Sequence, residues 1–351
     1  MQVLFLTYFN KIYAVYTHFC GKSTPKTEVV FSTRLWKNPH IFYNDLLDES
    51  IFSVQNYDQS QPFAIFNFSV IKTEQTEHAF LKKYVIITEH SSLSLCYNFF
   101  MQSSFNTIIK KLCTELKINF IELSNGWVFK LQKDGKTAYI IGNRFDLNLS
   151  ASGEIASDKS ATFSVLNHHL IPVIPHYVAF DNTLPQDLVY PVVLKPNRGS
   201  RGRGVTLCKN QNEAKTTATK LLKSFESICY SPYHESPYEY RTFYLDGKVL
   251  CIYRKTKPKG SWKHNLSGGA TPDLVPKGSL YRQIEELAIK TGQALNIRFA
   301  TIDILDTIDS GMMVLEVNQG VTTTIFSESV PGGKQIAEDI YRAALLAMFP
   351  R

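Results

Sequence analysis

The sequence predicts an α+β fold in which antiparallel hairpins alternate with amphipathic helices. Two Asp-Gly pairs, at 134–135 and 246–247, each separate two strand-like runs, which is the pattern of a β-hairpin. Apolar residues at helical spacing cover 278–294. Such hairpins are unlike the alternating single strands and helices of a Rossmann domain, so that class is excluded.

The first region, residues 1–95, is rich in aromatic residues and short apolar runs, such as 62–66 and 84–87. Residues 1–20 are apolar, but they lack the basic start and cleavage site of a signal peptide. Asn10 and Lys11 interrupt this run and leave it too short to span a bilayer. We expect one or two buried strands there, in an N-terminal α/β region that carries no chemical motif.

Two further regions follow, at 96–157 and 158–351, and their elements can be predicted in order. The middle region has a helix at 105–116, a strand at 118–121 and a hairpin formed by 127–131 and 137–141. In the last region we expect helices at 158–170, 211–224, 278–294 and 334–348, and strands at 171–174, 191–207 (two, around a glycine-rich loop), 239–245, 248–254, 299–305 and 312–318.

Composition excludes several classes of protein. The 351 residues carry a formal net charge of +7, but the basic residues are scattered and form no stripe, so a nucleic-acid partner is not expected. The six cysteines include no CxxC pair, and the nine histidines are dispersed, so a zinc site is not predicted. No membrane association and a cytoplasmic location are expected.

A lysine followed by a glycine-rich loop is the strongest local motif. The apolar strand 192–194 leads to Lys195, and Gly199, Gly202 and Gly204 follow within the loop. Glycines let backbone N–H groups approach phosphate oxygens closely, and a lysine neutralises phosphate charge. The loop is neither a Walker A motif nor a GxGxxG that opens a helix, and a basic surface hairpin is the alternative interpretation.

A cluster of oxygen ligands lies further along the chain. Asp303 lies in one predicted strand, and Glu316 and Asn318 lie two residues apart in the next, which places the latter pair on one face. Two carboxylates and an amide oxygen are ligands that suit magnesium. An unpaired carboxylate among apolar residues is costly, which favours a metal site over a solvated strand face.

These motifs, in this order, resemble the ATP-grasp superfamily over about 155–330, and within it the RimK-type glutamate ligases and the cyanophycin synthetase domain. Ser157-Asp158-Lys159 with Ile171-Pro172 is similar to the segment that supplies the first phosphate lysine. The resemblance implies two α+β subdomains that clasp ATP, with the lid near 191–235. The cofactors implied are ATP and two magnesium ions, which manganese can replace.

The resemblance also assigns roles to individual residues. The nucleotide-binding residues it implies are Lys159, Lys195, Gly199, Ser200, Arg201, Gly202, Gly204, Tyr230, Ser231, Tyr233 and Glu239. Cys229 to Tyr233 would form the adenine hinge, which binds mainly through backbone groups, and Glu239 would hold the ribose. The metal ligands are Asp303, Glu316 and Asn318. Arg241, Lys255 and Asn265 are the candidates to stabilise a tetrahedral oxyanion.

The predicted activity is an ADP-forming carboxylate–amine ligase that acts through an acyl phosphate on amino acid, peptide or metabolite substrates. Lys255 and Lys263 replace arginines of the RimK-type pattern, and Gln319-Gly320-Val321 replaces its Ser-Pro-Gly, so the acceptor is left open. A small-molecule kinase and a non-catalytic nucleotide-binding protein are the alternatives. The oligomeric state is also open.

Overall fold

The computed structural model describes the backbone of residues 3–8, 11–19, 27–32, 64–68, 83–87, 92–199 and 202–350, and the side chains of 104–199 and 202–350. The chain divides into two units, Met1–Phe99 and Phe100–Arg351. No helix in the described residues is long and apolar enough to cross a membrane.

The first unit contains two small antiparallel sheets. β1 (Val3–Tyr8), β2 (Lys11–Phe19) and β3 (Thr27–Ser32) form one sheet in that order. β4 (Ala64–Phe68) pairs with β5 (Lys83–Ile87) in the other. The prediction of strands in the apolar first twenty residues is confirmed for β1 and β2, whereas their burial falls outside the described side chains.

The second unit begins within α1 (Ser92–Glu115) and contains three sheets. The first sheet has the order β6-β7-β8-β9, with β6 (Asn119–Leu123), β7 (Val128–Lys133), β8 (Lys136–Ile141) and β9 (Arg144–Phe145). The turn between β7 and β8 contains Asp134 and Gly135, both at positive φ, which confirms the first predicted hairpin. One face of this sheet packs against α1 and α7 (Gly333–Met348) in a single core.

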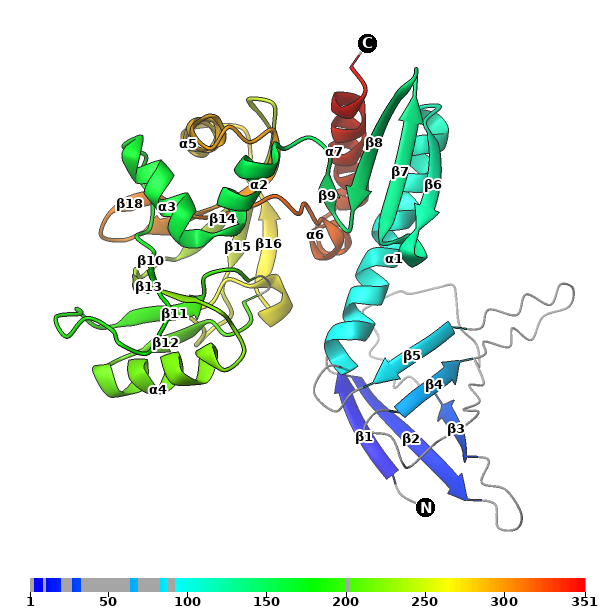
Figure 1. Cartoon of the computed structure of the whole chain (residues 1–351), viewed down its shortest axis with the longest axis horizontal. Coiled ribbons are helices and arrows are strands. Elements are labelled where there is room, and N and C mark those ends of the chain that lie inside the picture. Colours follow the sequence, from blue (N-terminus) through cyan, green and yellow to red (C-terminus); the bar gives the residue numbers. More distant parts are fainter. Residues whose placement is uncertain are drawn as a thin grey trace, which may run out of the picture. The chain divides into compact units, whose positions relative to one another are not determined.

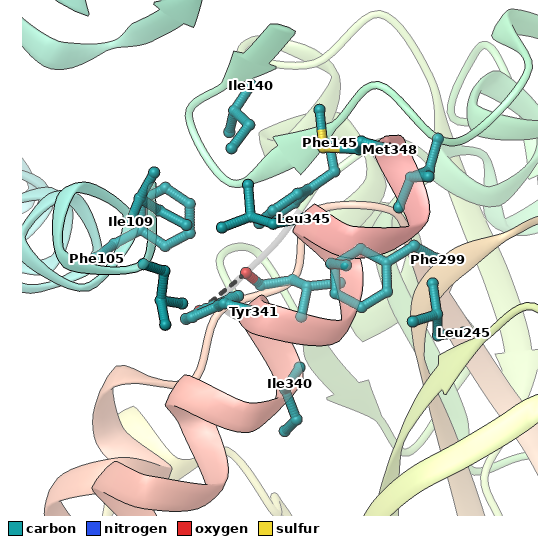
Figure 2. Packing of buried hydrophobic residues seen from close by; sticks show 14 of the residues in the cluster. Phe105, Ile109, Ile140, Phe145, Leu245, Phe299, Ile340, Tyr341, Leu345 and Met348 are labelled. Carbon is teal, nitrogen blue, oxygen red and sulfur yellow. Dashed lines mark hydrogen bonds between the residues drawn. The ribbon is translucent and has the colours of Figure 1, made fainter. Parts of the chain in front are cut away.

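Tyr341 of α7 lies at the centre of that core (Figure 2). Its ring packs against Phe105 of α1 and Phe145 of β9, with ring centroids 5.1 Å and 5.9 Å away. Its hydroxyl group accepts hydrogen bonds from the backbone N–H and the hydroxyl of Thr323, both at 3.1 Å. The first and last parts of the unit therefore share one core.

The second sheet has the order β10-β13-β11-β12, and α4 (Gln211–Leu222) runs along it (Figure 1). Ala214, Ala218 and Leu221 of the helix pack against Val192 and Leu194 of the sheet. The strands are β10 (Tyr177–Ala179), β11 (Val192–Pro196), β12 (Thr206–Cys208) and β13 (Ile228–Pro232). The predicted strand, glycine-rich loop and strand thus correspond to β11, its loop and β12.

The third sheet has the order β16-β15-β14-β17-β18. Its strands are β14 (Tyr238–Leu245), β15 (Lys248–Thr256), β16 (Thr271–Leu274), β17 (Phe299–Thr307) and β18 (Gly311–Asn318). Apolar side chains of α5 (Ser279–Ala294) and α3 (Lys159–His168) pack against one face of this sheet. The unit also contains two short helices, α2 (Ser150–Ser157) and α6 (Thr324–Ser329). The α+β class is confirmed.

The segment 171–174, which we predicted to be a strand, instead forms one isolated bridge. Val173 pairs with Val314 in parallel, and Ile174 donates its N–H to the Val314 carbonyl at 2.9 Å. Pro172 and Pro175 flank these residues and have no N–H to donate, so a longer ladder cannot form. In the chain, this segment connects α3 to β10 of the second sheet, and its hydrogen bonds attach it to β18 of the third sheet.

Candidate functional site

The sheet register brings charged side chains from three strands together. Arg241 of β14 is paired with Asp303 of β17, and Asp303 is paired with Glu316 of β18. The Asn318 amide donates a hydrogen bond to Oε1 of Glu316 at 3.1 Å. The prediction that Glu316 and Asn318 share one face of a strand, with Asp303 beside them, is therefore confirmed, whereas their role as metal ligands stays a prediction.

Asp303 belongs to a buried network of two acids and two bases. Arg241 donates from Nε and Nη2 to the two carboxylate oxygens, at 2.7 Å and 2.5 Å. Lys255 donates to Asp303 at 3.1 Å and also to Glu239. Burial raises the pKa of Asp303, but the charges of Arg241 and Lys255 outweigh it and hold this pKa below its usual range. Arg241 and Lys255, the candidates to stabilise an oxyanion, are thus bonded to the Asp303 carboxylate, and their predicted role stays a prediction.

The two predicted phosphate lysines come from different elements, and Lys159 forms an ion pair with Glu316. Lys159, at the start of α3, has its Nζ 4.0 Å from Oε2 of Glu316, and it donates to the Gly199 carbonyl at 3.2 Å. Lys195 of β11 is only 6% exposed. Burial lowers the pKa of Lys195, and the charges of Cys229 and Glu316 oppose this shift. A basic group of α3 is therefore paired with an acidic group of the third sheet, and the charge of that acid also acts on the buried lysine of the second sheet.

The glycine-rich loop lies against the segment that carries Asn265. Gly202 and Gly204 have φ values of 67° and 72°, which favour glycine. A Cβ atom on Gly202 would lie 2.8 Å from Nδ2 of Asn265, so a side chain there would strain the backbone and displace the Asn265 amide. The Lys263 ammonium group donates to the Val205 carbonyl at 2.7 Å, and this hydrogen bond also holds the loop against the segment that carries Asn265. Ser200 and Arg201 lie outside the described residues.

The predicted adenine hinge corresponds to β13 and the residue after it. Tyr230 pairs with Tyr177 on one side and Leu194 on the other, so its main chain takes part in the sheet. A nucleotide contact by this residue would therefore involve its side chain. Ser231 is buried, and the ring of Tyr233 packs edge-on against Trp262 at 6.0 Å. Glu239, the predicted ribose contact, is held by Lys255.

Two buried histidines are residues that the sequence analysis missed. The Nε2 atoms of His176 and His264 have no hydrogen-bond partner among the described residues. Burial and the charges of Lys195 and Lys159 keep the pKa of His176 well below its usual value, so its imidazole is neutral. No local pattern in the sequence marks His176, which directly follows the Ile171–Pro175 segment.

These residues fit magnesium and a nucleotide triphosphate. Two carboxylates and an amide oxygen suit a hard cation, and two ammonium groups suit phosphate. No cluster of three or more His, Cys, Asp or Glu side chains that could hold a metal occurs in the described residues, so a third protein ligand would have to come from Asn318. The buried Nε2 atom of His176, which has no hydrogen-bond partner among the described residues, can bond to one further polar group.

Comparison with known protein families agrees with this geometry. Residues 156–343 match the RimK-like ATP-grasp domain. The protein belongs to this family. All the candidate site residues, from Lys159 to Asn318, lie within the matched region.

Several curated relatives of this family member are ligases. A probable alpha-L-glutamate ligase of Aeromonas salmonicida is 26% identical over 50% of this chain and 60% of its own length. The glutamate–LysW ligase ArgX of Sulfurisphaera tokodaii is 25% identical over 49% and 63%, and a D-alanine–D-alanine ligase of Clostridium perfringens is 29% identical over 44% and 54%. The chain therefore spans less than two thirds of each of these relatives.

A solved D-alanine–D-alanine ligase from Bacillus anthracis, complexed with ATP, is similar in structure. It aligns with a TM-score of 0.47 and 20% sequence identity, over 57% of this chain and 67% of that one.

Proposed function

We propose that the protein is an ATP- and magnesium-dependent ligase that joins a carboxylate to an amine and releases ADP and phosphate. The observation that carries this proposal is the ion pair of Lys159 with Glu316, which lies beside Asp303 and Asn318 in the sheet, while the charge of Glu316 also acts on the buried Lys195. Such an arrangement suits transfer of a terminal phosphate, because the transferred group needs its charge neutralised from several sides.

The proposed reaction has two steps. A carboxylate oxygen of the first substrate attacks the γ-phosphorus of ATP, the bond to the bridging oxygen breaks, and ADP leaves with that electron pair. The amine nitrogen of the second substrate then attacks the acyl carbon, loses a proton, and phosphate leaves. In this scheme, Lys159 and Lys195 bind phosphate oxygens.

The remaining residues have supporting roles in this scheme. Asp303, Glu316 and Asn318 would hold magnesium, which neutralises phosphate charge when it is bound. Arg241 and Lys255 orient Asp303, to which they are hydrogen bonded. Asn265 lies against the glycine-rich loop and is the candidate to contact the acyl group. The loop would cover the site and exclude water, which otherwise hydrolyses an acyl phosphate.

The test is a screen of amino acids and short peptides, alone and in pairs, for ADP release. Hydroxylamine is added to trap an acyl phosphate as a hydroxamate. We expect a hydroxamate with one carboxylate substrate and an amide product with the correct pair. AMP as the main nucleotide product contradicts the mechanism. A phosphorylated product without hydroxamate identifies a small-molecule kinase, and binding of ATP without turnover identifies a non-catalytic nucleotide-binding protein.

Lys195→Ala should reduce turnover about a hundredfold or more, because removing one preorganised charge at the transferring phosphate costs on the order of 3 kcal/mol. Lys209→Ala is the matched control, since Lys209 follows β12 and is exposed, and its turnover should equal the wild type. Arg201→Ala should have a smaller effect than Lys195→Ala. Steady-state ADP release measures all three, and equal losses in Lys195→Ala and Arg201→Ala would remove the special role of Lys195.

A further inference from the structure

A groove of about 900 Å³ lies on the second unit and contains none of the candidate site residues. One wall is the segment 169–172 after α3, and the other is one side of α5. Met312 and Leu287 contribute apolar surface, whereas Glu286 and Lys290 contribute one charge of each sign. The mixed charge makes the groove unsuited to a polyanion and leaves a protein surface as the natural partner.

Leu170 projects from the edge of this groove under conformational strain. It is 91% exposed and has a φ of 55°, in the left-handed region that disfavours a leucine. The N–H groups of Leu170 and Ile171 close the end of α3 by bonding to the Asn167 and Leu166 carbonyls, both at 3.0 Å. Glycine is the usual residue at such a helix end. A leucine that is both strained and exposed is explained if its side chain is buried against a partner.

The exposed side of α5 is complementary to the same side of a second, antiparallel copy of α5. Gln283 and Gln293 each lie five residues from position 288, and Glu286 and Lys290 each lie two residues from it. All four side chains are exposed. In an antiparallel pair of α5 helices related by a two-fold axis at position 288, Gln283 would face Gln293, and Glu286 would face Lys290 twice. Such self-complementarity is what a two-fold interface requires.

We propose that this face is a two-fold interface between two copies of the chain, in which the α5 helices pack antiparallel and each Leu170 enters the groove of the other copy. The proposal is independent of the ligase activity, because none of the residues in the groove is assigned to the site. Leu170 supplies the apolar contact, and the pairs of Glu286 and Lys290 set the direction of packing.

Charge reversals test the direction of packing in the full chain. We expect a dimer for the wild type by analytical ultracentrifugation at about 1 to 100 µM. Glu286→Lys and Lys290→Glu should each weaken the dimer by about tenfold or more, because each places like charges opposite one another twice. An equimolar mixture of the two variants should restore a dimer, since every pair is then attractive. Arg282→Glu is the matched control on an exposed position of α5 outside the groove, and should not weaken the dimer.

The Leu170→Gly variant distinguishes an effect on dimerisation from an effect on the stability of the fold. Glycine relieves the strained φ, so the thermal unfolding temperature measured on dilute, monomeric protein should stay equal or rise. The dimer should nevertheless weaken by about tenfold or more, because the apolar contact is lost. A wild type that is monomeric over the whole concentration range overturns the proposal. So does a dimer that survives all three single variants, or a mixture of the two charge variants that stays monomeric.

Discussion

Asp303 and Glu316 are neighbours in the sheet, but their negative charges are neutralised to different extents by nearby cations. Asp303 is 1% exposed and bonded to Arg241 and Lys255, whereas the side chain of Glu316 is 27% exposed and, among the described residues, forms an ion pair only with Lys159, at 4.0 Å. A charge change at Asp303 therefore leaves Arg241 without its carboxylate partner and Lys255 with Glu239 alone. The same change at Glu316 does not.

Glu316→Gln should abolish magnesium-dependent ATP turnover in a protein that keeps its stability. Asp303→Asn should also abolish turnover, and it should in addition lower the free energy of unfolding by about 3–5 kcal/mol, because it breaks a buried ion network. Turnover assays and chemical denaturation of both variants measure the difference. A fully active, folded Glu316→Gln variant would remove Glu316 from the site, and an equally stable Asp303→Asn variant would contradict the importance of the network for folding.

His264 makes stability depend on pH. Burial lowers its pKa to about 4, against 6.5 for the free side chain. Between pH 4 and 6.5 the unfolded chain binds a proton that the folded chain does not. The free energy of unfolding is therefore highest above pH 6.5 and decreases as the pH falls towards 4. The loss between pH 6.5 and 5 should be about 1–2 kcal/mol from this residue.

Urea denaturation at pH 7 and pH 5 tests this prediction with His264→Asn, whose amide can still donate to the backbone carbonyls of Ser236 and Pro237. The variant should lose less stability than the wild type on acidification, although His176 should keep part of the dependence, because burial also lowers its pKa. Identical pH profiles for the two proteins would show that His264 is not held neutral in the fold.

The sequence was sufficient to predict the candidate residues that have a local pattern. Lys195 precedes a glycine-rich loop, and Glu316 and Asn318 follow strand periodicity. It could not predict that Arg241 neutralises Asp303, because the two residues are separated by 62 positions and meet only through the pairing of β14 with β17. Nor does any local pattern mark His176, whose burial depends on the packing of two sheets.

At the scale of elements, the predicted hairpins were confirmed wherever an Asp-Gly turn defined them, as at β7–β8 and β14–β15. The turn chemistry is local, and it fixes both the loop and the register of the flanking strands. Residues 171–174 were mistaken for a strand because the prolines were taken to bound it, whereas Pro172 lies within the run and, with Pro175, removes the N–H groups that a longer ladder needs. The short helix α2 was missed, since its eight residues are mostly small and polar and show no clear amphipathic pattern.

Helix α5 depends on a glycine for its packing. A Cβ atom on Gly292 would lie 2.2 Å from Cζ of the buried Tyr244 ring of β14. Gly292→Ala should therefore lower the free energy of unfolding, because overpacking costs about 1–3 kcal/mol and exceeds the gain in helix propensity of about 1 kcal/mol. Chemical denaturation measures the change, with the exposed Arg282→Ala as a control expected to be within about 0.5 kcal/mol of the wild type. A more stable Gly292→Ala protein would show that α5 is not packed this closely on the sheet.

At the scale of the whole second unit, Tyr341 joins segments that are far apart in the chain. Its hydroxyl group accepts from the buried N–H of Thr323. Tyr341→Phe should lower the free energy of unfolding by about 1–3 kcal/mol, because that N–H is then left buried without an acceptor. The control is Tyr281→Phe, since the buried Tyr281 hydroxyl has no hydrogen-bond partner among the described residues, and its removal should be neutral or stabilising. Equal losses in the two variants would indicate a general effect of the missing oxygen.

The position of α7 in that core has a consequence for synthesis on the ribosome. Phe105 and Phe145 are translated long before Tyr341 and Leu345, which complete their packing. At roughly 5–20 residues per second, the interval is on the order of 10–40 s. During this time the apolar face of the sheet β6–β9 is open to water or to chaperones. The nascent chain therefore passes through a long-lived, aggregation-sensitive stage that ends only when α7 emerges and docks.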